Sequence, residues 1–293
     1  MTQVGRQDGL LHPTTVREVR ALAERARRED GVEALGEQTL LNLADPTAPV
    51  VHLLAGSGEA LEGYGQVQSG ENLTAELVVT PGARGKGVGQ ALLAEVLALA
   101  GENDAAPAVW AHGDLPGART LASRSGLTVV RELWQMAADL PLEQPAAAAP
   151  DGVTVRPFVV GQDEGAWLTV NARAFATHPE QGRMTLADLE AREREAWFDP
   201  DDLLLAERDG LVIASVWLKA EAGSDAGELY VLAVDPDAQG QGLGRLLTAR
   251  AVEHLTGRGL HRIELYVSPQ DEAAVRTYTR AGLTVSRVDV QYG

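Results

Sequence analysis

The sequence predicts an α/β protein of two tandem domains, each a mixed, mostly antiparallel β-sheet flanked by helices. Three observations support this fold class. Residues 73–100 are repeated in residues 228–255, strand-like runs alternate with helical runs in both halves, and residues 141–152 have the composition of a linker. At 293 residues the chain is long enough for two domains of about 100–200 residues each.

The internal repeat has an offset of 228 − 73 = 155 residues, so Pro81 corresponds to Pro236. The offset also matches three glycines in each copy: Gly85, Gly87 and Gly89 with Gly240, Gly242 and Gly244. Two copies of domain size indicate a duplicated domain rather than a solenoid. The run PLEQPAAAAPDG between them has no amphipathic spacing. We therefore expect domains at 1–140 and 153–293, joined by a linker at 141–152.

The elements of the second half can be placed in order from their hydrophobic spacing. Apolar and β-branched runs predict strands at 153–158, 203–207, 211–218, 228–234, 261–267 and 283–290. Helical spacing predicts helices at 163–175, 242–255 and 271–281. Arg208-Asp209-Gly210 is a hairpin turn signal. The first half follows the same order after two opening helices near 14–28 and 36–43. Hairpins followed by β-α-β-α-β imply a mixed sheet with helices on its faces.

Composition argues against several kinds of partner and site. Lys plus Arg is 25 and Asp plus Glu is 42, giving a net charge of −17, which disfavours binding to nucleic acid or an anionic membrane. Aromatic residues make up only 4%, too few for a base-stacking platform. The chain has no cysteine, which excludes disulfides, thiolate metal sites and a Cys nucleophile. Its six histidines show no metal-ligand spacing, so we expect no metal.

The location of the protein is an expectation from absent signals. No apolar run approaches the length of a membrane span, and the N-terminus has no apolar stretch behind a basic start. We therefore expect a cytoplasmic protein. We also expect a monomer whose partners are small molecules.

A glycine-rich loop joins a predicted strand to a predicted helix in each half, at 84–90 and 239–245. Glycines permit positive φ and a close approach of the backbone to a ligand. A helix N-terminus adds N–H groups without intrahelical partners, and together these features suit a pyrophosphate. A glycine-rich turn without a ligand is the alternative.

Spacing excludes two better-known phosphate loops. A Walker A motif needs Lys followed by Ser or Thr, but Lys86 is followed by glycine and Gln241 stands at the equivalent position of the second copy. A Rossmann fingerprint needs a third glycine, which would fall on Gln90 or Arg245.

The remaining pattern, [Q/R]-x-x-G-x-G after a strand ending in Val-Asp-Pro or Val-Thr-Pro, resembles the acyl-CoA loop of the GCN5-related N-acetyltransferases (GNAT). The resemblance implies acetyl-CoA as co-substrate, with its pyrophosphate on the loop amides and its pantetheine arm along the preceding strand. In the second half the implied cofactor-binding residues are Leu232, Ala233, Val234, Gln239, Gly240, Gln241, Gly242, Leu243, Gly244, Arg245, Asp271, Glu272, Ala273, Ala274, Val275 and Arg276. In the first half they are Leu77, Val78, Val79, Arg84, Gly85, Lys86, Gly87, Val88 and Gly89.

Two residues of the second half fit the chemistry of N-acetylation, which needs a base for the amine and a proton for the leaving thiolate. Glu228 lies on the strand before the loop and suits the base. Tyr278 lies on the helix expected near the thioester sulfur, and a phenol with a pKa of about 10 can protonate a thiolate. The resemblance suggests the same two catalytic roles.

The first half lacks both groups at the matching positions. The repeat offset places Leu73 at Glu228 and Ala122 at Tyr278. Glu76 is three residues out of register, and an odd shift on a strand points a side chain to the opposite face. We therefore expect a catalytic second domain and a non-catalytic first domain that keeps an acetyl-CoA-binding loop.

Longer runs of the second half resemble the mycothiol synthase branch of this family. The matching runs are Asn171-Ala-Arg-Ala-Phe175, His178-Pro-Glu-Gln-Gly182, Phe198-Asp-Pro200 and Ala273-Ala-Val-Arg-Thr-Tyr278. The resemblance implies acetyl transfer from acetyl-CoA to the cysteinyl α-amine of cysteinyl-glucosaminyl-inositol, giving mycothiol. A base is useful there, because an α-amine has a pKa near 7.7–8.0 and is largely protonated at neutral pH. The acceptor-binding residues that it implies are Glu37, Glu180, Lys219, Glu228 and Tyr266.

Two alternatives remain open from the residues. A tandem GNAT enzyme could acetylate another small amine, such as an aminoglycoside or a polyamine. A non-catalytic acyl-CoA sensor would keep both loops but need neither Glu228 nor Tyr278, and only the first half has lost both groups.

Overall fold

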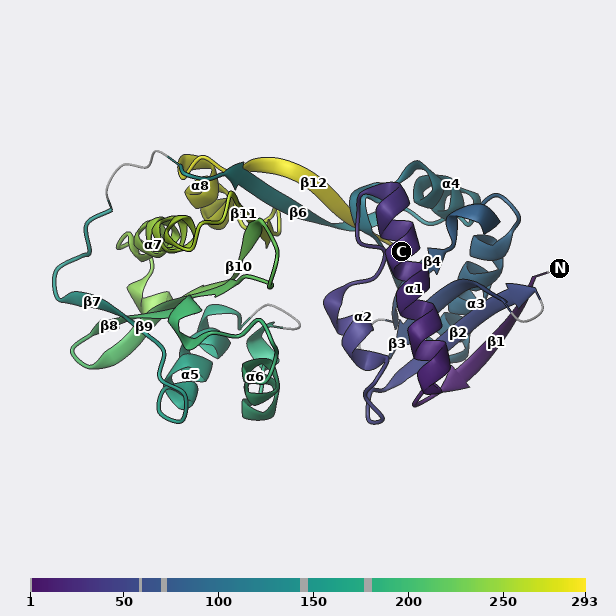
Figure 1. The fold of residues 1–293 in the computed structure, drawn as a ribbon, viewed down its shortest axis with the longest axis horizontal. Helices are drawn as coiled ribbons and strands as arrows, with labels where there is room; N and C mark the ends of the chain where they lie inside the picture. The colour runs from purple at the N-terminus through teal and green to yellow at the C-terminus, as the bar shows by residue number, and fades with distance from the viewer. Residues whose placement is uncertain (1, 58–59, 70–72, 143–146, 177–180) are drawn as a thin grey trace. The chain divides into compact units, whose positions relative to one another are not determined.

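The computed structural model of the protein divides into two compact units (Figure 1). Unit 1 comprises Met1–Leu133 and Val288–Gly293, and unit 2 comprises Trp134–Arg287. The structure describes residues 2–57, 60–69, 73–142, 147–176 and 181–293. Each unit has a mixed sheet flanked by helices, so the predicted fold class is confirmed.

Unit 1 is a sheet in the order β1-β2-β3-β4-β5, completed by the end of β12. The strands are β1 (Gln3–Asp8), β2 (Val50–Ser57), β3 (Ala60–Gln68), β4 (Leu73–Val79), β5 (Pro107–Ala111) and β12 (Thr284–Tyr292). All neighbours are antiparallel except β4 and β5, which are parallel. The helices are α1 (Pro13–Asp30), α2 (Glu37–Asn42), α3 (Val88–Glu102) and α4 (Pro116–Arg124), with short 3₁₀ turns at Pro81–Ala83 and His112–Asp114.

The sheet of unit 1 lies between α1 and α3. Apolar residues of α1, such as Leu22, pack with Tyr64 and Val78 on one face. Apolar residues of α3, such as Leu92, pack with Leu53 on the other face. This burial of two helices against one sheet removes apolar surface from water on both faces.

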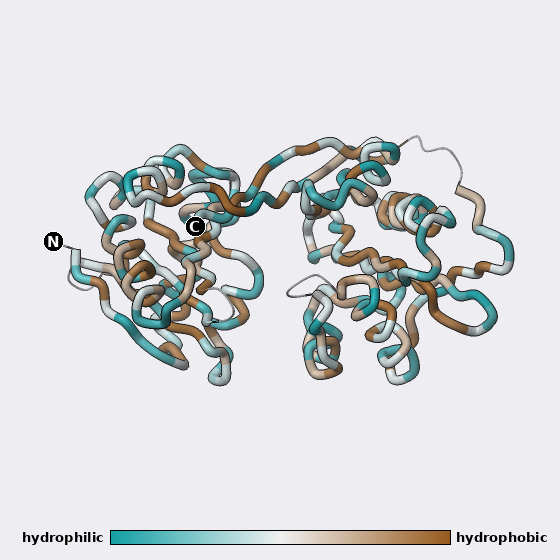
Figure 2. Tube along the Cα trace, turned by 180° about the vertical axis from the view of Figure 1, so that it is seen from behind, coloured by the Kyte–Doolittle hydropathy of each residue, from teal (hydrophilic) through white to brown (hydrophobic). Residues whose placement is uncertain are grey.

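Unit 2 has the sheet order β6-β11-β10-β9-β8-β7. Its strands are β6 (Val129–Asp139), β7 (Val153–Pro157), β8 (Leu203–Arg208), β9 (Leu211–Lys219), β10 (Ala226–Val234) and β11 (Arg262–Val267). Only β10 and β11 are parallel among the pairs of this unit's described strands. The helices are α5 (Glu164–Ala174), α6 (Leu186–Glu193), α7 (Leu243–Gly257) and α8 (Glu272–Arg280), with 3₁₀ turns at Gln181–Arg183, Pro200–Asp202 and Pro236–Ala238. Figure 2 shows hydrophobic stretches along the strands and teal, hydrophilic residues at many turns.

The last strands of the two halves are exchanged. Strand β6 precedes the expected linker, yet Trp134–Asp139 pairs with β11 of unit 2. Strand β12 ends the second half, yet Val290 to Tyr292 pair with β5 of unit 1. The compact units therefore have different bounds from the ranges 1–140 and 153–293, which left each final strand in its own half. Period-two patterning shows that a segment is a strand but does not specify its partner.

The predicted elements agree closely with the observed ones. Each helix and strand predicted above by its residue range ends within two residues of its observed bounds. Helix α6 has no predicted counterpart, although Thr185 and Asp188 form a capping box at its start. The described linker residues, 141–142 and 147–152, lie outside helices and strands.

Candidate functional site

The two glycine loops have the same backbone conformation. In unit 2, Gly240 and Gly242 have φ of 76° and 85°, and in unit 1 Gly85 and Gly87 have φ of 74° and 88°. The second glycine of each pair is the N-cap of the following helix. Since the first α7 bond runs from Leu246 N to Gly242 O, the amides of residues 243–245 lie in a first turn without intrahelical acceptors. This is the backbone geometry that suits an anion.

Side chains of each loop bend back onto its own backbone. Gln239 Nε2 donates to Val234 O at 3.4 Å, and Arg84 Nε donates to Val79 O at 3.2 Å. The two loops are therefore closed in the same way onto the end of the preceding strand. Arg84 differs in also making a bidentate ion pair with Asp30, at 2.7 Å for both bonds. That pairing raises the pKa of Arg84 and offsets a charge that would otherwise face an anion.

Strands β10 and β11 separate beside the loop of unit 2. Their parallel pairing covers Ala226 to Glu228 on β10, opposite Arg262 to Glu264 on β11. Beyond that point β10 continues to Val234 while pairing with β9 alone in the described part of the chain. Backbone groups of residues 232–234 on the β11 side are thus left for another partner.

Lys219 and Glu228 lie on one face of this sheet. Lys219 on β9 and Glu264 on β11 are the Cα partners of Glu228 on β10. Their strand neighbours belong to the core cluster packed with α7: Leu218, Leu229, Ile263 and Leu265. Because side chains alternate along a strand, the three polar residues point away from that core. Tyr266 is two residues beyond Glu264 and shares its face.

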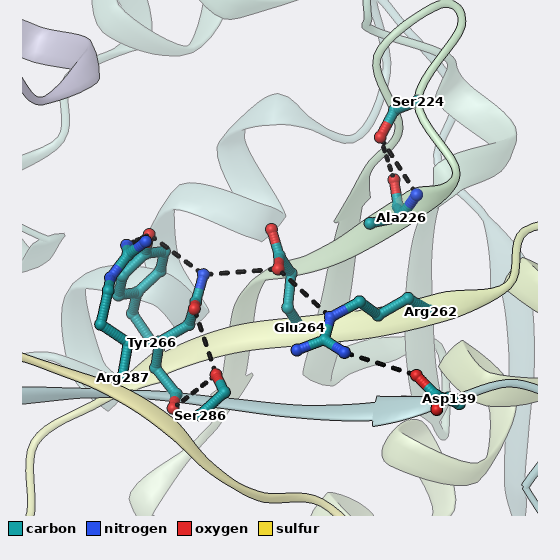
Figure 3. A network of polar contacts seen from close by, with 9 residues as sticks. Asp139, Ser224, Ala226, Arg262, Glu264, Tyr266, Ser286 and Arg287 are labelled. Atoms are coloured by element: carbon teal, nitrogen blue, oxygen red, sulfur yellow. Dashed lines mark hydrogen bonds and ion pairs between the residues drawn. The ribbon is translucent and has the colours of Figure 1, made fainter. Parts of the chain in front are cut away.

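Tyr266 is held by a polar network that sequence analysis did not identify (Figure 3). Arg287 lies beside its ring, with Cζ 5.7 Å from the ring centroid, and donates from Nη2 to the phenol oxygen at 2.5 Å. Gln135 Nε2 donates to the same oxygen at 3.4 Å and to Glu264 Oε2 at 3.3 Å. Gln135 lies on β6, so the strand exchange brings it into the second unit.

Two aromatic rings lie beside the ammonium of Lys219, and the sequence analysis did not predict them as part of the site. This ammonium lies 5.1 Å from the ring centroid of Trp197 and 5.9 Å from that of Tyr230. Tyr230 occupies an irregularity in the pairing of β9 with β10, where the register shifts between Leu229 and Val231. Such a bulge re-aims side chains near functional sites. Trp197 and Tyr230 do not form a motif with Lys219 in the sequence, so no sequence signal marked them as part of the site.

Tyr278 lies on α8 and packs into the core cluster with α7, on the other face of the sheet from Glu228. Only 7% of the residue is exposed. Burial, with a smaller contribution from the Asp271 charge, raises the pKa of Tyr278. The phenol therefore stays protonated at neutral pH and can donate a proton. The structure does not bring the two predicted catalytic side chains onto one face.

The residues at the start of α8 have helix-terminal roles. Asp271 Oδ1 accepts a hydrogen bond from Ala274 N and caps the helix. Arg276 pairs with Glu272 one turn earlier, at 2.9 Å. Arg245, on the first turn of α7, is exposed.

The matching positions of unit 1 carry apolar residues. Leu73 and Ala122 are both buried in apolar clusters. Glu76 is bonded to His112 and to the amide of Gly36, so it is not placed as a base toward a ligand. Glu37 is exposed at the start of α2. The predicted acceptor residue Glu180 lies outside the described residues.

The described residues hold no group of three or more His, Asp or Glu side chains placed to bind a metal ion. No described helix is both long enough and apolar enough to cross a membrane.

Comparison with known proteins places the chain in a family. The model of the acetyltransferase (GNAT) family matches residues 171–283. The mycothiol acetyltransferase of Cellulomonas flavigena is 53% identical to this chain, covering 97% of this chain and 87% of the relative. That of Sanguibacter keddieii is 50% identical, covering 93% and 91%.

Solved structures support the tandem fold. A GCN5-related N-acetyltransferase from Sphaerobacter thermophilus superposes with a TM-score of 0.73 at 24% identity, covering 99% of this chain and 94% of that one. A tandem GNAT protein from the clavulanic acid biosynthesis pathway gives 0.75 at 17% identity, covering 100% and 98%. With the relatives, the paired glycine loops and the separated strands, these likenesses show that the chain belongs to the mycothiol acetyltransferase family of GNAT proteins.

Proposed function

We propose that the chain transfers an acetyl group from acetyl-CoA to the cysteinyl α-amine of cysteinyl-glucosaminyl-inositol, giving mycothiol. The observation that carries the proposal is the position of Glu228. It is the last β10 residue paired with β11, at the point where the strands separate and next to Lys219. The relatives are named mycothiol acetyltransferases, and the resemblance to that family implies the acceptor, since the GNAT fold alone does not specify an amine.

In the proposed binding mode the loop of unit 2 holds the pyrophosphate on the amides of residues 239–245. The pantetheine arm pairs with the free side of residues 232–234. The dipole of α7 supports the anion, with Arg245 at its first turn and Arg276 on α8 as nearby cations. These local features are needed because the chain carries a net charge of −17. We also propose that residues 271–276, at the start of α8, contact the bound acetyl-CoA.

In the proposed reaction Glu228 removes a proton from the amine, directly or through a water molecule. The amine nitrogen then attacks the thioester carbonyl carbon, and N–H groups near residues 232–234 stabilise the oxyanion. The C–N bond forms, the C–S bond breaks, and Tyr278 gives its proton to the leaving thiolate. Burial raises the pKa of Tyr278, so the phenol is protonated but is a weaker acid, and its proton moves only as negative charge develops on the leaving sulfur.

The acceptor offers several hydroxyl groups, and burying these without partners would be costly. Lys219, Glu228 and Tyr266 share one sheet face and supply a cation, a carboxylate and a phenol. We propose that they bind the acceptor, and we propose Glu37 and Glu180 as further acceptor-binding residues, as the resemblance implies. Unit 1, with Leu73 and Ala122 at the matching catalytic positions, is proposed to bind acetyl-CoA without catalysing transfer. We further propose that the enzyme is a cytoplasmic monomer that needs no metal.

The test is acetyl transfer to cysteinyl-glucosaminyl-inositol, with mass detection of the N-acetyl product. A thiol assay of released CoA alone is ambiguous, because the acceptor carries its own thiol. We expect product from the wild type and a large loss with Glu228→Gln. If acetyl-CoA binds but no product forms, the acceptor assignment is wrong, and a panel of aminoglycosides and polyamines becomes the next assay.

A further inference from the structure

A buried ion cluster lies in unit 1 and contains none of the catalytic residues proposed above. His112 follows β5, and its side chain is 18% exposed. Its Nε2 lies 3.2 Å from Glu76 Oε1, and its Nδ1 lies 3.0 Å from Asp289 Oδ2. An ionised carboxylate only accepts hydrogen bonds, so both ring nitrogens donate and the imidazole is protonated. The carboxylates come from β4 and β12, which are more than 200 residues apart (289 − 76 = 213).

Glu76 extends the cluster to the start of α2. Its Oε2 accepts a hydrogen bond from Gly36 N at 2.7 Å, and the Thr39 hydroxyl also bonds to its carboxylate. A Cβ on Gly36 would lie 2.9 Å from Glu76 Oε1, so the backbone approaches this carboxylate closely. The two anchored residues, Gly36 and Thr39, stand on either side of Glu37, which is exposed. Glu76 therefore contacts the backbone directly before Glu37 and a side chain two residues after it.

A second contact set fixes the rest of α2. Gln66 on β3 donates to Thr39 O at 3.0 Å and accepts from Asn42 Nδ2 at 2.8 Å. Arg20 Nη2 also donates to Leu40 O at 3.0 Å. These contacts hold the C-terminal half of α2, and the bond from Gly36 N to Glu76 holds its N-terminal end. The carboxylate of Glu76 is in turn oriented by His112.

We propose that His112 is a positioning residue for acceptor binding, acting through Glu76 and the Gly36–Thr39 segment on Glu37. The inference rests on the proposed function, in which Glu37 contacts the acceptor. It assigns to unit 1 a role in acceptor recognition that depends on Asp289, and thus on the exchanged strand β12. His112 itself does not touch the acceptor.

The kinetic test compares His112→Asn with the wild type. Asparagine offers donors on one group only and cannot bridge both carboxylates. We expect the KM for cysteinyl-glucosaminyl-inositol to rise about tenfold, the effect of roughly one weakened hydrogen bond to a charged group. The KM for acetyl-CoA should stay within about twofold, since unit 2 binds the reacting acetyl-CoA. Glu76→Gln keeps an acceptor for Gly36 N and should be milder than Glu76→Ala.

A double-mutant cycle separates positioning from general destabilisation. In a Glu37→Ala background, His112→Asn should add little to the acceptor KM, because the contact it positions is already gone. Additive effects would overturn the proposal. Val96→Ala is the matched control, since this α3 core residue is fully buried in a cluster that does not include α2. It should lower stability without raising the acceptor KM.

Hydrogen exchange gives a readout that needs no substrate. The amides of residues 36–40 should exchange faster in His112→Asn than in Val96→Ala at equal stability. Unchanged exchange there would overturn the positioning role, whatever the acceptor is. A wild type that makes no mycothiol would instead refute the proposed function, and faster exchange would then leave His112 as an anchor of α2 with no acceptor role.

Discussion

Glu228 and Glu264 are Cα partners in the last parallel pair before β10 and β11 separate, and they share one face of the sheet. The geometry distinguishes their roles. Glu228 is also the Cα partner of Lys219 on β9, whereas the carboxylate of Glu264 accepts a hydrogen bond from Gln135. We predict that Glu228→Gln lowers kcat at pH 7 by about 10²- to 10⁴-fold, the usual contribution of a general base. Glu264→Gln is the matched control and should change kcat by less than about tenfold. Equal losses in steady-state assays would contradict the assignment of the base.

Tyr278→Phe removes one hydroxyl from a buried ring and keeps its packing. We predict a fall in kcat of about 10²-fold with little change in the KM for acetyl-CoA, because the phenol acts on the leaving thiolate. Burial raises the pKa of Tyr278, so its ionisation should produce no fall in the wild-type kcat below pH 10.

The control for Tyr278 is Tyr292→Phe, which removes a phenol bonded to Asp114 in unit 1 at 2.7 Å. It should leave kcat unchanged while altering stability. If both variants lose activity to the same extent, the loss reflects packing rather than proton transfer.

The two glycine loops allow a paired test of which unit turns over acetyl-CoA. Gly242→Ala and Gly87→Ala each place a Cβ on a backbone with φ above 80°, and neither Cβ would meet an atom within 4 Å. Each should therefore cost a similar 1–2 kcal/mol, roughly, from backbone strain alone. Only Gly242→Ala should raise the KM for acetyl-CoA in turnover, by about tenfold. A matching rise with Gly87→Ala would show that the first loop takes part in catalysis.

The sequence was sufficient for the parts of this fold that depend on local signals. The spacing of Leu243, Leu246 and Leu247 predicts α7, and the glycines before it predict the loop that the structure shows. Sequence motifs also identified Glu228 and Tyr266. These residues lie on the neighbouring strands β10 and β11 and share one face of the sheet. Local rules work here because each element buries a stripe of its own side chains.

Long-range pairing was beyond those rules. Gln135 precedes the linker by sequence but bonds to Glu264 and Tyr266, because β6 belongs to the sheet of unit 2. Asp289 likewise reaches His112 only because β12 returns to unit 1. A strand's alternation is the same whichever sheet accepts it, so neither contact leaves a trace in spacing.

The stability of unit 1 depends on pH because the ring nitrogens of His112 lie beside the carboxylates of Glu76 and Asp289. Burial lowers the pKa of His112, but the hydrogen bonds and charges of Asp289 and Glu76 outweigh it and raise that pKa to about 9. The unfolded chain has the ordinary value near 6.5, so the folded state binds the proton more tightly.

The stabilisation is therefore full below pH 6.5, declines as the pH rises toward 9, and is lost above that. Its size is on the order of 3 kcal/mol, since each unit of pKa corresponds to about 1.4 kcal/mol. Urea unfolding at pH 6, 7.5, 9 and 10 should show the wild type losing its advantage over His112→Asn across this range. Titrations of groups other than His112, Glu76 and Asp289 cancel in the difference. A difference that stayed constant from pH 6 to pH 10 would mean that the imidazole is not protonated between its two carboxylates.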